Sequence, residues 1–111
     1  MDQWNVGEAA ALMQEKRDLH QLETAAEILR ALADAHRLRV LIRLAESELN
    51  VSQLAELENE KMQTMSARLQ VLLAARLVKR RRAGQTALYA IADAHVLNLV
   101  DNALAHASET H

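Results

Sequence analysis

The chain contains almost none of the residues that interrupt helices and strands. Proline is absent, and glycine occurs only at positions 7 and 84. Helix ends must therefore be set by capping side chains and by packing rather than by chain breakers. Half of the 111 residues are hydrophobic but only 2% are aromatic, so a core must consist of Leu, Ala, Val, Ile and Met. This composition favours a single, mainly helical domain.

Apolar periodicity and two short runs around Gly84 predict the order of the elements. Residues 1–20 form an N-terminal arm or helix, and further helices follow over residues 22–33, 36–45, 51–57, 62–75 and 94–108. Ser52 is expected to cap the helix over residues 51–57. Residues 77–82 and 86–91 form a β-hairpin, with Gly84 in a turn that requires positive φ. Residues 21–111 are therefore predicted to be a winged helix-turn-helix domain.

The helix over residues 62–75 has one apolar side and one side of small or hydrogen-bonding residues. The apolar side comprises Met62, Met65, Leu69, Leu72 and Leu73. The opposite side comprises Gln63, Thr64, Ser66, Ala67, Arg68 and Gln70. Amide and guanidinium groups read base edges and phosphates, and small residues let a helix enter the major groove. On its own this side is equally compatible with a plain solvent-exposed surface.

A run of four cations follows this helix. Lys79, Arg80, Arg81 and Arg82 occupy the first predicted strand, and Gln85 lies in the turn. The net charge of the chain is −2, so the basic patch is local. Adjacent like charges repel unless an anion neutralises them, and a wing lying along a phosphate backbone would be neutralised in this way. A solvated charge run is the usual alternative, but after a helix–turn–helix pair we favour contact of both elements with DNA.

The last predicted helix carries two pairs of metal-ligand residues, Asp93 with His95 and His106 with Glu109. The two histidines are 11 residues apart, close to three turns, and lie within about 20° of one stripe. The pairs are nevertheless about 16 Å apart along the helix, too far for one ion whose ligand bonds are near 2 Å. The chain has no Cys, so any site must use nitrogen and oxygen.

Antiparallel pairing of this helix with its copy in a homodimer removes the difficulty. The first pair of one subunit then meets the second pair of the other, twice per dimer. The predicted dimer seam consists of Val96, Leu99, Val100, Ala103, Leu104 and Ala107. Four tetrahedral nitrogen and oxygen ligands suit Zn(II), two per dimer, with Co(II) as a substitute. A Ni(II) or Co(II) sensor with His20 or His111 as added ligands is the alternative.

These features together resemble the ArsR/SmtB family of metal-responsive repressors, from about residue 22 to residue 109. Residues 32–41, which read LADAHRLRVL, resemble an early family signature with Ala35 in place of its usual Pro. Residues 77–91 resemble the family's wing. The residues that match the last-helix zinc site of the SmtB-like branch, one by one, are Asp93, His95, His106 and Glu109.

The resemblance also carries an informative departure. Asn50 stands where thiolate-using members of the family have Cys, so their site is missing here. The resemblance implies a homodimeric repressor that binds operator DNA when it is metal-free and dissociates when zinc binds.

Other classes of protein are disfavoured by what the sequence lacks. It has no glycine-rich phosphate loop, nucleophile elbow or HExxH motif, which argues against an enzyme with a small-molecule substrate. No apolar run reaches the roughly 20 residues of a membrane span, and no signal-peptide pattern opens the chain, so we expect a soluble cytoplasmic protein. A winged-helix dimer that binds a protein partner instead of DNA remains a second alternative.

Overall fold

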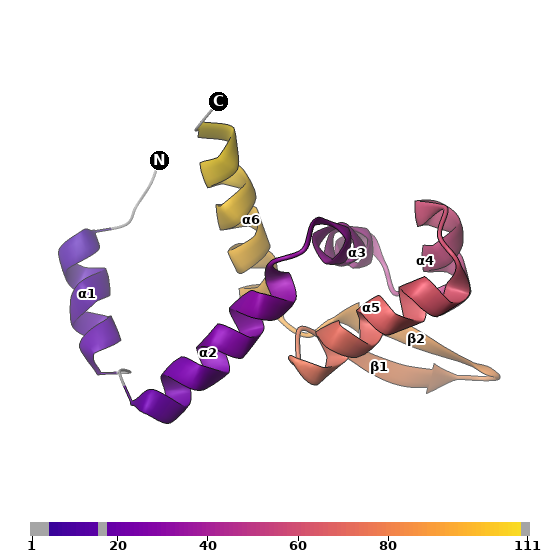
Figure 1. Cartoon of the computed structure of the whole chain (residues 1–111), viewed down its shortest axis with the longest axis horizontal. Coiled ribbons are helices and arrows are strands. Elements are labelled where there is room, and N and C mark those ends of the chain that lie inside the picture. Colours follow the sequence, from indigo (N-terminus) through magenta and orange to yellow (C-terminus); the bar gives the residue numbers. More distant parts are fainter. Residues whose placement is uncertain (1–4, 16–17, 110–111) are drawn as a thin grey trace.

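A computed structural model of the chain describes residues 5–15 and 18–109. In chain order its elements are α1 (Val6–Gln14), α2 (Leu19–Leu32), α3 (Ala35–Glu46), α4 (Val51–Glu58), α5 (Met62–Ala74), β1 (Val78–Ala83), β2 (Thr86–Ile91) and α6 (Ala94–Glu109). Figure 1 shows α3, α4 and α5 gathered beside the hairpin, with α6 rising from its open end. This order confirms the predicted winged helix-turn-helix fold.

Aspartates begin α2 and α3, as expected in a chain without proline. Asp18 Oδ1 accepts the backbone N–H of His20 at 2.8 Å, so α2 begins at residue 19 rather than at the predicted residue 22. Asp34 Oδ1 accepts the backbone N–H of Arg37 at 2.9 Å. That hydrogen bond is the main reason why the pKa of the Asp34 carboxyl lies below its ordinary value.

The start of α4 differs from the prediction. Asn50 and Gln53 form a reciprocal capping box, each accepting the other's backbone N–H at 2.8 Å. Ser52 lies inside α4, so its predicted role as the cap is wrong. The Asn-x-x-Gln spacing was the sequence signal for the true cap.

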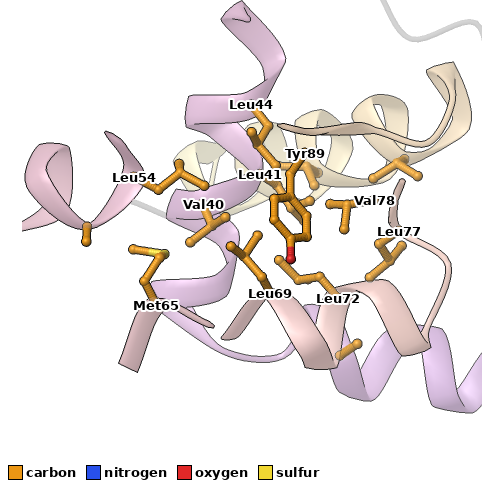
Figure 2. Close-up of a cluster of buried hydrophobic side chains, with 14 residues drawn as sticks. Val40, Leu41, Leu44, Leu54, Met65, Leu69, Leu72, Leu77, Val78 and Tyr89 are labelled. Atoms are coloured by element: carbon orange, nitrogen blue, oxygen red, sulfur yellow. The ribbon is translucent and has the colours of Figure 1, made fainter. Parts of the chain in front are cut away.

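The core lies where α3, α4 and α5 meet the hairpin. In Figure 2 the ring of Tyr89 lies among aliphatic side chains that include Leu41 and Leu69. The buried residues are Ala31, Val40, Leu41, Leu44, Leu54, Ala55, Met65, Leu69, Leu72, Leu77, Val78, Tyr89, Val96 and Val100. Burial of one large apolar side chain contributes roughly 1.5–3 kcal/mol, so this cluster fixes α5 and the hairpin relative to each other.

The hairpin strands pair antiparallel along their whole length. Gly84 in the turn has a φ of 66°, which confirms the expected positive φ. Leu49 forms an isolated bridge with Tyr89 of β2, with backbone hydrogen bonds of 3.1 and 2.8 Å. The segment before α4 therefore lies beside the hairpin like a short third strand.

Apolar surface remains uncovered on the first two helices, α1 and α2. No residue of α1 is buried, and Leu22 and Leu29 of α2 are 50% and 58% exposed. The radius of gyration is 15.9 Å, against about 13 Å for a compact domain of this length.

None of the helices in the described part of the chain is long and apolar enough to cross a membrane.

Candidate DNA interface and metal-ligating residues

Helix α5 is anchored on one side and leaves the predicted recognition side open. Met65, Leu69 and Leu72 are fully buried, whereas Met62 is 54% exposed, so its predicted place in the anchor is wrong. Most of the opposite side is accessible to solvent. Gln63, Ala67 and Gln70 are exposed, and Thr64 and Ser66 are partly exposed.

Arg68 differs from its neighbours on the predicted recognition side. Its guanidinium Nη2 donates to Glu60 Oε2 at 3.0 Å, and its side chain is only 17% exposed. Glu60 lies in the turn between α4 and α5, so this ion pair fastens the two helices of the helix–turn–helix together. The guanidinium is thus engaged within the protein.

All four cations of the wing are exposed, as is Gln85 in the turn. Arg81 makes a two-pronged ion pair with Glu48, at 3.0 Å from Nε and 2.7 Å from Nη2. These hydrogen bonds are the main reason why the pKa of the Glu48 carboxyl lies below its ordinary value and that of Arg81 lies above. Sequence reasoning missed Glu48 because it lies 33 residues from Arg81. The bridge between Leu49 and β2 is what brings it to the wing.

Asp93 and His95 meet at the start of α6. Asp93 Oδ1 caps the helix by accepting the backbone N–H groups of His95 at 2.9 Å and Val96 at 3.3 Å. The same oxygen lies 3.5 Å from His95 Nδ1. Both side chains face solvent, with exposed fractions of 58% and 91%. The cap holds the carboxylate beside the imidazole without burying either group.

His106 and Glu109 form a similar pair at the other end of α6. Nδ1 of His106 lies 4.0 Å from Oε1 of Glu109, and both side chains are well exposed. In a tetrahedral site with ligand bonds of about 2.1 Å, neighbouring donor atoms are about 3.4 Å apart. The separation in the first pair meets that requirement, and a small rotation of the exposed His106–Glu109 side chains would meet it too. Imidazole and carboxylate donors therefore fit Zn(II) or Co(II).

One chain does not bring the two pairs together. The described residues contain no group of three or more His, Cys, Asp or Glu arranged to hold a metal ion. Fewer residues of the predicted dimer seam are available to a partner than the sequence suggested. Val96 and Val100 are buried in their own core, so their assignment to the seam is wrong. Leu99 and Leu104 remain 42% and 44% exposed.

The additional histidines considered as ligands occupy different places. His20 lies in the first turn of α2 and lines a groove of about 530 Å³, to which Asp93 and His95 also contribute. His111 lies outside the described residues.

Known proteins match both the sequence and the fold. The family described as a helix-turn-helix domain matches residues 32–81. The transcriptional repressor SmtB homolog of Synechocystis sp. is 40% identical over 96 residues, which cover 86% of this chain and 73% of that protein. The HTH-type transcriptional repressor SmtB of Mycobacterium tuberculosis is 38% identical over 88 residues, covering 79% of this chain and 65% of that protein.

The solved structures agree. A homodimeric winged helix-turn-helix DNA-binding domain from Mycobacterium bovis, described as a possible ArsR-family regulator, superimposes with a TM-score of 0.79 and 34% identity. The match covers 84% of this chain and 86% of that one. Family and fold are those of transcriptional regulators rather than enzymes. The chain belongs to the ArsR/SmtB family of DNA-binding transcriptional repressors.

Proposed function

We propose that this protein is a zinc-responsive repressor, which binds operator DNA as a metal-free homodimer and is released when Zn(II) binds. The observation that carries the proposal is the pair of exposed His–carboxylate couples at the two ends of α6, with donor atoms 3.5 and 4.0 Å apart. Each couple supplies two ligands of a four-ligand site, and a second copy of the chain supplies the other two.

The DNA-binding part is supported by the exposed side of α5 and by the basic wing. Gln63 and Gln70 present amides that suit base edges in the major groove. The wing cations lie along strand β1 of the hairpin that packs against α5, where a phosphate backbone would pass. The same order of elements docks recognition helices of related folds into the major groove.

The dimer is supported by uncovered apolar surface. Leu99 lies on α6 between the two ligand pairs and is 42% exposed in the single chain. An isologous contact between two α6 helices would cover Leu99 in both subunits. The same contact would place Asp93 and His95 beside the partner's His106 and Glu109.

Release from DNA requires that the two forms of the dimer bind zinc with different affinity. When bound, zinc supplies bonds that fasten the two α6 helices together. A dimer fastened in this way would hold the two α5 helices so that they no longer fit successive major grooves. Couplings of this kind typically amount to about 1–3 kcal/mol, or roughly 5- to 150-fold in DNA affinity.

A DNA-binding titration with and without zinc tests the proposal. The DNA is a labelled duplex with the sequence directly upstream of the gene for this chain. We expect His106→Ala to bind this duplex as the wild type does but to stay bound at low micromolar zinc. His36→Ala is the matched control, because His36 is an exposed histidine that lies on α3 and not on α6. Loss of zinc response in both variants, or in neither, contradicts the assignment.

The optical spectrum of the Co(II) form tests the coordination. Intense visible bands are expected for four tetrahedral ligands. Weak bands would indicate six ligands and would assign the protein to Ni(II) or Co(II) sensing instead.

A further inference from the structure

The wing presents its cations on two faces. Successive residues of a strand point to opposite sides, so Lys79 and Arg81 share one face and Arg80 and Arg82 share the other. Arg80 pairs in register with Tyr89, and paired residues of an antiparallel hairpin lie on the same face. Tyr89 is 4% exposed in the core beside α5. Arg80 and Arg82 therefore lie on the face of the hairpin that is directed toward α5.

On the other face, Arg81 is paired with a carboxylate of the same chain. Glu48 accepts two hydrogen bonds from Arg81, at 3.0 and 2.7 Å. Its position is fixed by the backbone bridge of the adjacent Leu49 to Tyr89. Among the described residues, neither Arg80 nor Arg82 forms an ion pair. Arg81 is thus neutralised within the chain, whereas Arg80 and Arg82 on the opposite face carry unpaired positive charge.

We infer that, of the three arginines of the wing, Arg80 and Arg82 contact DNA phosphates, whereas Arg81 is a positioning residue held by Glu48. This inference rests on the proposed DNA binding and names the surface that performs it. A phosphate that approached Arg81 would have to displace an aligned carboxylate and would meet the negative charge of Glu48. A phosphate at Arg80 or Arg82 meets neither obstacle. In Figure 1 the hairpin runs alongside α5, with its tip at the same end of the molecule as α4.

Two neighbouring arginines provide a matched test. Arg81→Gln and Arg82→Gln change the same residue type and the same charge at adjacent positions on opposite faces. The affinity of each full-length variant for the upstream duplex is measured at several salt concentrations. Each lost phosphate contact makes the slope of log affinity against log salt shallower by about 0.9. We expect the slope to become shallower by this amount in Arg82→Gln. In the double variant that carries both Arg80→Gln and Arg82→Gln, we expect about twice this change.

Arg81→Gln is expected to leave the slope unchanged. Loss of its positioning role lowers the affinity by the same factor at every salt concentration. A slope that becomes shallower in Arg81→Gln as much as in Arg82→Gln would overturn the inference. So would an unchanged slope in the double variant. If the wild type shows no salt-dependent binding to the duplex, the proposed function itself fails, which is a separate outcome.

Discussion

Arg76 has a backbone conformation that arginine rarely adopts. Its φ is 61°, and its backbone N–H donates to the carbonyl of Leu73 at 3.0 Å while that of Leu77 donates to Leu72 at 2.9 Å. These hydrogen bonds close the end of α5 and require a left-handed residue between helix and strand. The left-handed conformation costs an L-residue roughly 1–2 kcal/mol, whereas glycine adopts it freely.

Replacing Arg76 with glycine is therefore expected to stabilise the protein. We predict that Arg76→Gly raises the free energy of unfolding in urea by about 1 kcal/mol, after allowing for the greater freedom of glycine in the unfolded chain. Arg76→Ala is the control, because it removes the same side chain but keeps the left-handed strain. Equal stability of the Gly and Ala variants would show that the backbone conformation carries no penalty here.

At the scale of elements, the contact between Glu48 and the wing makes stability depend on pH. The pKa of the Glu48 carboxyl lies below its ordinary value of 4.5, chiefly because Arg81 donates hydrogen bonds to it. A carboxyl whose pKa is depressed by folding stabilises the folded state at pH values above its ordinary pKa. That contribution is lost as the pH falls through the depressed value.

We therefore predict that Glu48→Gln is less stable than the wild type at pH 7. The difference should begin to shrink near pH 4.5 and disappear once the pH falls below the depressed pKa of Glu48. Urea unfolding at a series of pH values measures the difference. Glu56→Gln is the control, since Glu56 is an exposed residue of α4 that forms no ion pair within the described chain. A stability gap in Glu48→Gln that persists at low pH would contradict the role of the ionised pair.

The elements also show where sequence reasoning succeeds. Strand β2 was predicted over its full length because Gly84 is the only glycine inside the domain and marks the turn. Periodicity correctly found an apolar side on α6, but it could not tell that Val96 belongs to the chain's own core while Leu99 is left uncovered. That distinction depends on neighbouring elements rather than on spacing. The ion pair of Glu48 was likewise beyond prediction, since a bridge between distant segments creates it.

At the scale of the whole molecule, the four ligand candidates define a two-fold arrangement. Asp93 with His95 and His106 with Glu109 lie near the opposite ends of α6. An antiparallel partner brings unlike ends together, and Leu99 then faces the partner's copy of the residues midway along the helix. Either pair alone offers two ligands, fewer than the four of a closed tetrahedral zinc site. If these four residues bind zinc as proposed, we expect tight binding to require two copies of the chain.

A mixture of two inactive variants tests this requirement. A homodimer of His95→Ala lacks one ligand in each of its two sites, and so does a homodimer of His106→Ala. A heterodimer of the two variants concentrates both losses in one site and leaves the other with all four ligands. We predict that each variant alone fails to bind zinc tightly, whereas the mixture after subunit exchange binds it. Calorimetry or the visible spectrum of Co(II) measures this.

The expected recovery follows from counting dimers. Random exchange of equal amounts makes about half of the dimers heterodimers, each with one complete site, so the mixture should bind about a quarter of the metal bound by the wild type. A site contained within one chain would never recover on mixing, because every chain carries one of the two losses. A control mixture of His95→Ala with Asp93→Ala should also stay inactive, since both substitutions damage the same end of α6. Recovery of zinc binding in that control would contradict the shared site. So would a lack of recovery in the first mixture.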